Sequence, residues 1–246
     1  MKMSKNLLYL FCLILCTACY AREQKPVETE EEKEIVLEES FIDTRSYKQL
    51  KTDIRTKRLE YQKAYNKGNK AAKDSIVADA QQFLANEAHL FFREWYGTPW
   101  TFEGHTQTPR EGSIACGYFV TTTLRDMGFD IPRIYWAQQD ALYVVKKLSS
   151  DVNRFYQVPM DDIVKHIDEK GEGLYIVGLD NHVGYIYFRN GEKNFVHSNY
   201  YRRNIGVMSE PLVGENPLNN SQLRVIGKIL DKEMTKNWIQ NKKYEK

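Results

Sequence analysis

The sequence predicts an α+β fold in which helices pack on a small antiparallel sheet. Two kinds of observation predict this class. Residues 70–95 carry apolar side chains at helical spacing. Farther along, residues 173–179 and 182–188 are rich in β-branched and aromatic side chains, and Asn190-Gly191 after them is a strong hairpin signal. The helices are therefore concentrated in the first half of the chain and the strands in the second.

The composition is that of an ordinary globular protein with a sizeable core. The chain has 246 residues, of which 42% are hydrophobic and 28% charged, with a net charge of +2. A net charge this small gives no indication of a nucleic-acid partner. No short ligand pair with the usual zinc spacing is present, so we expect neither a metal nor another cofactor.

Residues 1–19 have the pattern of an export signal. Two lysines precede an apolar run at 7–15, which is too short to span a bilayer. Small residues then precede Cys19, and the pattern resembles a bacterial lipoprotein signal, in which this cysteine is lipidated. Cleavage after Ala21, with a freely secreted product, is the alternative. We expect an exported protein of the cell envelope, held at the membrane through Cys19.

The next segments predict a tether followed by a helical hairpin. Residues 20–46 are acidic, lack glycine and have little to bury, which is typical of a solvated tether. Residues 47–95 predict two helices, at about 47–65 and 70–95, separated by a break around Gly68. We expect this hairpin to pack on the domain that follows.

The remaining chain predicts one domain over residues 96–232 and a final helix over 233–246. An irregular aromatic segment leads into a helix that begins at Cys116, with Ser113 as its N-cap and Gly128 as its stop. Residues 216–221 are expected to form a loop. The other predicted elements are helices at 137–148 and 160–169 and strands at 173–179, 182–188, 193–200 and 224–230.

Cys116 is the candidate nucleophile. The other three cysteines lie in the leader, so no disulfide can form within the body of the mature chain. A thiol in the first turn of a helix is close to the positive end of the peptide dipoles, which favours the nucleophilic thiolate. The alternative is that Cys116 is a small buried hydrophobic residue.

The predicted hairpin brings two histidines together. With a two-residue loop at Asn190-Gly191, His182 faces Asn199 and lies diagonally from His197 on the same face of the sheet. His182 would then take the thiol proton, and His197 would orient the His182 ring, with Asn199 as the competing candidate for that role. Backbone N–H groups at the start of the Cys116 helix could stabilise an oxyanion.

Five motifs follow one another along the chain: Gly97-Thr98-Pro99-Trp100, Ala115-Cys116-Gly117-Tyr118-Phe119-Val120, Ile131-Pro132-Arg133, His182-Val183-Gly184-Tyr185-Ile186-Tyr187 and Val196-His197. In this order they resemble the NlpC-type branch of papain-like cysteine peptidases, which are bacterial cell-wall hydrolases. The resemblance covers roughly residues 91–200 and implies a papain-like fold, with Cys116 as nucleophile, His182 as base and His197 as orienting residue.

Three residues of the expected substrate cleft differ from the family pattern. Ala115 stands where relatives have an aspartate that helps to recognise the free amine of a stem peptide. Trp100 replaces a tyrosine, and the bulky Tyr118 replaces a small glycine. The resemblance implies hydrolysis of amide bonds in peptidoglycan stem peptides. The alternatives are a papain-like acyltransferase or amidase acting on a non-wall substrate, and a non-catalytic binding lipoprotein.

Overall fold

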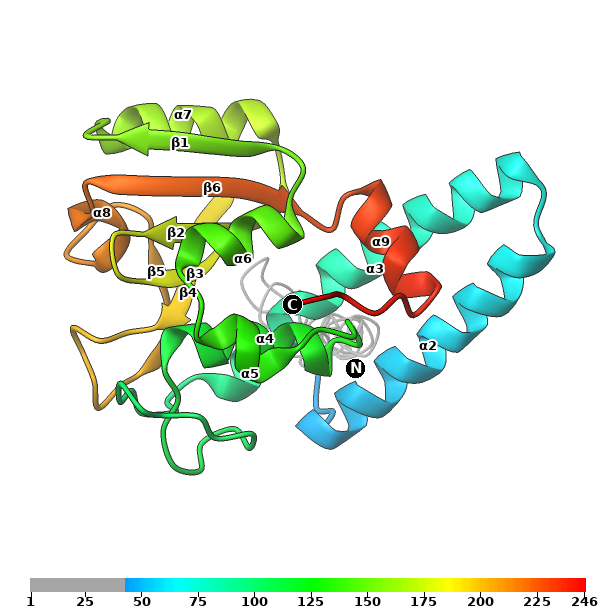
Figure 1. Cartoon of the computed structure of the whole chain (residues 1–246), viewed down its shortest axis with the longest axis horizontal. Helices are drawn as coiled ribbons and strands as arrows, with labels where there is room; N and C mark the ends of the chain where they lie inside the picture. The colour runs from blue at the N-terminus through cyan, green and yellow to red at the C-terminus, as the bar shows by residue number, and fades with distance from the viewer. Residues whose placement is uncertain (1–42) are drawn as a thin grey trace, which may run out of the picture. The chain divides into compact units, whose positions relative to one another are not determined.

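A six-stranded antiparallel sheet is the centre of the fold, in a computed structural model that describes residues 43–246 (Figure 1). Its strands are β1 (Val152–Tyr156), β2 (Gly173–Leu179), β3 (Val183–Arg189), β4 (Glu192–Ser198), β5 (Val207–Pro211) and β6 (Leu223–Ile229). Their spatial order is β1-β6-β2-β3-β4-β5. Together with the helices around it, this sheet confirms the predicted α+β class.

Eight helices accompany the sheet within residues 43–246. They are α2 (Tyr47–Lys67), α3 (Lys70–Trp95), α4 (Cys116–Asp126), α5 (Arg133–Ala137), α6 (Ala141–Leu148), α7 (Met160–Lys170), α8 (Pro217–Asn220) and α9 (Lys232–Ile239). Residues 45–246 form one compact unit. The expected export signal, Cys19 and nearly all of the expected tether lie outside the described residues. Within those residues, no helix has both the length and the apolar character needed to cross a membrane.

Both faces of the sheet are covered, which places it between two layers of helices. Strand β2 shows this most simply, because Leu174 and Ile176 join one apolar cluster while Tyr175 and Val177 join the other. Helices α3, α4 and α6 contribute to the first cluster, and α7 and α8 contribute to the second. A strand that is buried on both faces has the continuous apolar sequence seen in β2, with alternate side chains serving opposite layers.

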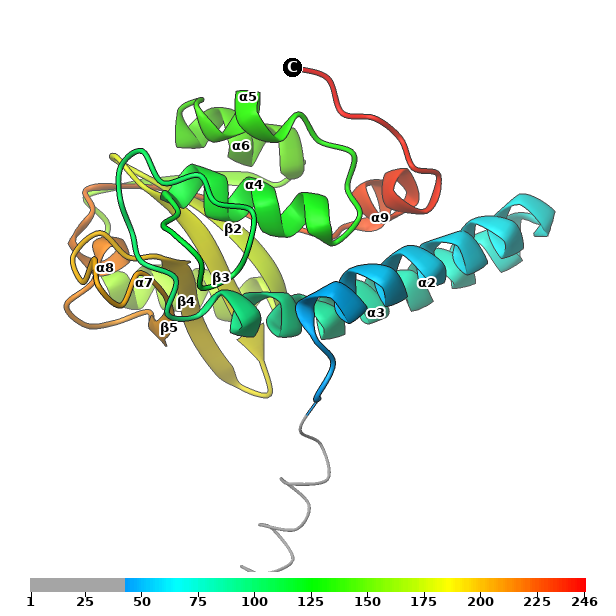
Figure 2. The ribbon, with the colours of Figure 1, turned by 90° about the horizontal axis from the view of Figure 1, so that it is seen from below.

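Helices α2 and α3 form the predicted hairpin, and their ends agree with the sequence to within two residues. Ser46 caps α2 by accepting a hydrogen bond from the Gln49 N–H, and Asn69 caps α3 in the same way. The two helices lie side by side and extend beyond the sheet (Figure 2). Trp238 of α9 packs against the rings of Tyr61 and Phe83, which joins the hairpin to the end of the chain.

The β3–β4 hairpin has the register that the sequence predicted. Asn190 and Gly191 both have positive φ, at 52° and 79°, as a two-residue type I′ turn requires. The ladder pairs Arg189 with Glu192 and continues to Tyr185 and Val196. Because side chains alternate along a strand, this register decides which residues of the two strands share a face.

Several predicted elements differ from the structure. Ala115, not Ser113, is the N-cap of α4, and the Ser113 hydroxyl instead contacts Thr101 Oγ1 at 2.7 Å. The expected stop at Gly128 is confirmed by its φ of 93°. The expected helix at 137–148 is wrong in its first turn, because Asp140 accepts from the Tyr143 N–H and starts a new helix, α6.

Two strands and two short helices, α5 and α8, were missed. Strands β1 and β5 are the edges of the sheet, and edge strands tolerate polar residues and proline, which removes the usual strand signal. The expected loop at 216–221 contains α8, which begins with Pro217 at its first turn and is capped by Asn216. The final helix α9 ends at Ile239, so residues 240–246 are not helical.

Candidate active site

Cys116 is the first residue of α4, and the segment before it is attached to two parts of the fold. The N–H of Ile114 donates to the Pro99 carbonyl at 2.9 Å, and the N–H of Ala115 donates to the Gly104 carbonyl at 2.8 Å. The Ser198 hydroxyl, at the end of β4, donates to the Ile114 carbonyl at 2.7 Å. These bonds position the start of α4 beside the β3–β4 hairpin, which carries both candidate histidines.

Cys116 and His182 line one cleft of about 740 Å³. The cleft also contains the three residues that the sequence placed there, Trp100, Ala115 and Tyr118. The N–H of Val183, the residue after His182, donates to the Cys116 thiol, so the thiol and the start of β3 are direct neighbours. The structure therefore brings the candidate nucleophile and the candidate base to the same place.

His182 and His197 form a direct hydrogen bond. His182 Nε2 lies 2.8 Å from His197 Nδ1, and the two rings are nearly perpendicular at 86°. His182 is 3% exposed and His197 is fully buried. Gly184 makes room for the pair, because a Cβ at Gly184 would lie 2.9 Å from the Cβ of His197. His182 Nδ1 is then the ring nitrogen left over for the thiol.

A carboxylate follows His197. His197 Nε2 lies 2.7 Å from Glu210 Oε1, and Glu210 is only 8% exposed. Three side chains, His182, His197 and Glu210, therefore form a line of contacts that starts at the cleft of Cys116, and we refer to them as the relay. Sequence reasoning missed Glu210 because β5 was not predicted. The one available signal was Gly206, which closes a polar turn after β4 and indicates that a further strand returns beside it.

Asn199 does not occupy the place beside His182. Its side-chain oxygen accepts from the backbone N–H groups of Tyr201 and Arg202, at 2.7 and 3.1 Å. Its amide nitrogen consequently faces Glu210 and lies 3.2 Å from Oε1. Of the two candidates for the orienting residue, the geometry therefore puts His197 in contact with His182 and puts Asn199 behind it.

Burial dominates the ionisation of the site. Desolvation raises the pKa of the Cys116 thiol, although backbone N–H donors from Val183 and Gly117 lower it in part. Desolvation, and then the nearby His197, hold the pKa of His182 well below its ordinary value. At neutral pH the two groups are therefore a neutral thiol and a neutral imidazole. The helix terminus favours the thiolate, as the sequence predicted, and burial acts in the opposite direction by raising the pKa of the thiol.

The far end of the relay is desolvated too. Burial, and then the positive charge of Arg202, lower the pKa of His197 to about 3. Burial raises the pKa of Glu210, and Arg202 opposes that change. Among residues 43–246, no three histidine, cysteine, aspartate or glutamate side chains are grouped so that they could hold a metal ion.

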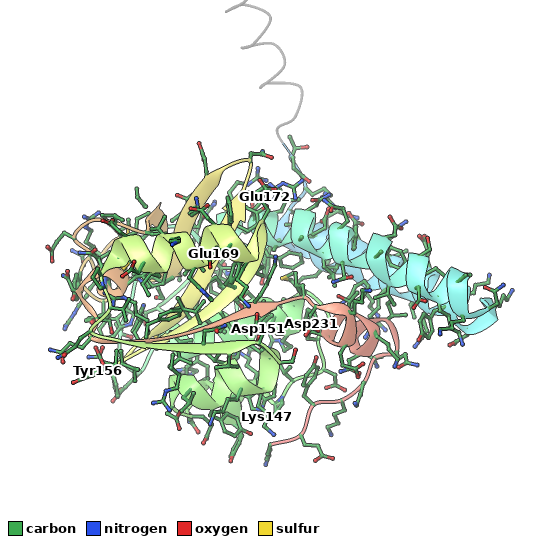
Figure 3. All side chains as sticks on the ribbon, turned by 90° about the horizontal axis from the view of Figure 1, so that it is seen from above. Lys147, Asp151, Tyr156, Glu169, Glu172 and Asp231 are labelled. Atoms are coloured by element: carbon green, nitrogen blue, oxygen red, sulfur yellow. The ribbon has the colours of Figure 1, made fainter. Side chains whose placement is uncertain are left out.

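A second cavity, of about 910 Å³, runs along α2, and we refer to it as the basic groove. Helix α2 lies on the near side in Figure 2, which views the protein from below. Figure 3 views the opposite side, where Asp151, Glu169 and Glu172 lie. The buried Asp126 in this groove accepts hydrogen bonds from Tyr47 and Arg125. The cationic residues lining the groove are Lys48, Lys51, Arg55, Arg58 and Arg125.

The comparisons with known proteins do not assign the chain to a family. No family model matches the chain. No curated protein matches it either. Among solved structures, the chain is similar to an N-acetylmuramoyl-L-alanine amidase from Bacteroides uniformis ATCC 8492, with a TM-score of 0.32 and 10% identity over 61% of this chain and 99% of that one. Membership of the NlpC-type peptidases therefore remains a resemblance carried by the sequence motifs.

Proposed function

We propose that this chain is an exported cysteine hydrolase that cleaves amide bonds in peptidoglycan stem peptides. The observation that carries the proposal is the 2.8 Å contact between His182 Nε2 and His197 Nδ1, in a site where His182 and Cys116 line the same cleft. A cysteine nucleophile needs a base nearby and a third group that orients the base. The shared cleft of Cys116 and His182 and the contact between the two histidines support these roles.

The ring nitrogens have separate roles in this proposal. His182 Nε2 donates to His197 Nδ1, so the lone pair of His182 Nδ1 is available to Cys116. On attack, the thiol proton moves to His182 Nδ1 while sulfur bonds to the substrate carbonyl carbon. His182 then returns the proton to the amide nitrogen as the C–N bond breaks, which leaves a thioester. Water hydrolyses the thioester, with His182 taking a proton from it and returning one to the departing sulfur.

The start of α4 supplies the donors for the developing oxyanion. Ala115 caps α4 without a side-chain hydrogen bond, so no capping side chain competes for the N–H groups of its first turn. An aspartate at position 115, as the resemblance would predict, could accept one of these hydrogen bonds itself. The first-turn N–H groups and the helix dipole both favour negative charge at this place.

The stem-peptide assignment is supported by the sequence resemblance and by the expected export signal. The cleft adds an apolar and aromatic wall, formed by Trp100, Phe102, Tyr118 and Tyr200. Glu103 is the only Asp, Glu, Lys or Arg among the described residues that line it, so the cleft favours neutral or cationic groups over carboxylates. We also propose attachment to the cell envelope through Cys19, which is tested by whether the protein fractionates with membranes.

The second candidate keeps the chemistry and changes the substrate to a non-wall amide or an acyl acceptor other than water. Ala115 favours it, because the carboxylate that recognises a stem-peptide amine in relatives is missing next to Cys116. Tyr118 adds bulk to the same cleft. The bond that is cleaved distinguishes the two candidates.

The test is mass spectrometry of fragments released from purified cell walls by the protein and by its Cys116→Ala variant. We expect the wild type to release peptide fragments whose masses identify the bond, and the variant to release none above background while its melting temperature stays within a few degrees. Equal release by both proteins would remove Cys116 from the mechanism. Release of nothing by the wild type, with turnover of a small amide or transfer of its acyl group, would favour the second candidate.

A further inference from the structure

Glu210 reaches the site from a strand that carries no other candidate residue. In the β4–β5 ladder it pairs with Phe195, which places it diagonally from His197, because His197 pairs with Met208 two residues away. The register therefore directs this carboxylate to the far side of the His197 ring from His182. Its Oε1 atom lies 2.7 Å from His197 Nε2, and the carboxyl group is almost fully buried.

The hydrogen bonds at Glu210 determine which atoms carry protons. Asn199 Oδ1 accepts two backbone N–H groups, so the NH₂ of Asn199 points to Glu210 Oε1. Oε1 thus receives donors and acts as an acceptor, and His197 must carry its hydrogen on Nε2. A neutral His197 then has its lone pair on Nδ1, which accepts from His182 Nε2. The arrangement leaves the lone pair of His182 on Nδ1.

We propose that Glu210 is a positioning residue which, acting through His197, keeps the lone pair of His182 on Nδ1 and stabilises the imidazolium that forms when His182 takes the Cys116 proton. The proposal rests on the function proposed above. The proposal adds Glu210 to Cys116, His182 and His197. Both histidine rings lie between the Glu210 carboxylate and the thiol. The proton itself travels only between Cys116, His182 and the substrate.

The surroundings of Glu210 fit this role. Glu210 contacts His197 and Asn199, and one charged side chain, Arg202, also faces it. Arg202 Nη1 lies 3.9 Å from Glu210 Oε2, and the Arg202 side chain is 48% exposed. Arg202 thus balances the carboxylate from the solvent side and leaves Oε1 to the relay. A charge this close to a buried imidazole is poorly screened, so it acts on the ionisation of the histidines more strongly than a surface charge would.

The test compares Glu210→Gln with a matched Glu87→Gln variant. Glu87 is also mostly buried, with its side chain 13% exposed, and it pairs with Arg45 in the helical hairpin. We expect Glu210→Gln to lower kcat about 10-fold with KM changed less than twofold, because the amide keeps its oxygen towards His197 and Asn199 but lacks the charge that stabilises the His182 imidazolium. Glu210→Asp should recover part of the loss, and Glu87→Gln should leave kcat unchanged.

Two further readouts separate positioning from folding. Nitrogen-15 NMR of the side chains should show His182 protonated on Nε2 in the wild type and in Glu210→Gln, and a mixture of both tautomers in Glu210→Leu, which removes the acceptor for His197. Burial raises the pKa of Glu210, so its charge destabilises the fold above that pKa, and the glutamine variant should melt no lower than wild type at pH 7. An unchanged tautomer in Glu210→Leu, together with a kcat of Glu210→Gln within twofold of wild type, would overturn the proposal. If Cys116→Ala is as active as wild type, the proposed function fails, and the NMR result still decides the tautomer.

Discussion

The cleft that contains Cys116 and the basic groove are both lined by the loop of residues 100–113, but their charged groups differ in exposure. Behind the cleft, three ionisable groups are buried and each contacts the next. Along the groove, Lys48 and Arg55 are exposed, and neither forms an ion pair within residues 43–246. Water screens the exposed charges of the basic groove but not the buried groups of the relay. One substitution in the relay should therefore lower activity more than two substitutions in the groove.

The two histidines of the relay provide the largest expected effect. His182→Ala removes the base itself and should lower kcat/KM by roughly 1,000-fold or more. His197→Ala removes only its orientation and should cost about 10- to 100-fold. Fragment release from cell walls measures both, and His197→Gln, which keeps a polar group in the buried site, guards against loss of folding. A larger loss for His197 than for His182 would show that His197 acts directly and not through its neighbour.

The pH dependence of activity is the next effect in size. His182 loses its role as base only below its lowered pKa, and the thiol ionises only above its raised pKa. Between the ordinary values of the two groups, 6.5 and 9.0, kcat/KM should therefore change less than twofold. A pH–rate profile measures this. An acidic limb centred above 6.5 would show instead that the relay stabilises a charged His182 in the resting protein.

The smallest effect is expected in the basic groove. The double variant Lys48→Gln/Arg55→Gln should change the free energy of unfolding by no more than about 0.5 kcal/mol and leave kcat within twofold, since both side chains are exposed. Asp126→Ala, in the same groove, should cost about 2 kcal/mol or more, because Tyr47 and Arg125 lose a buried acceptor. Chemical denaturation measures both. Similar values for the two variants would mean that burial does not explain the contrast.

Much of the fold could be predicted because its signals are local. The turn at Asn190-Gly191 fixes the β3–β4 register through backbone conformation alone, so the pairing of the two strands could be read before the structure. The same holds for the hairpin of α2 and α3, where caps and apolar spacing lie within one segment. The predicted proximity of His182 and His197 followed from that register.

The rest depends on contacts between distant segments. Glu210 sits on an edge strand whose identity comes from pairing with β4, and no local pattern distinguishes its carboxylate from other glutamates. The neutral state of Cys116 likewise follows from the protein packed around the thiol, whereas the sequence shows only the start of the helix. Charge and burial at a site are properties of the assembled fold, which explains why residues could be placed more reliably than ionisation states.

The neutral resting state of Cys116 has a consequence for durability. Peroxides oxidise thiolates to sulfenic acid and beyond, while protonated thiols react slowly. Cys116 is a free cysteine within residues 43–246, and burial raises the pKa of its thiol. An exported protein is out of reach of cytosolic reductants. Desolvation of Cys116 disfavours the nucleophilic thiolate, and for the same reason it slows oxidation and prolongs the lifetime of the reduced thiol.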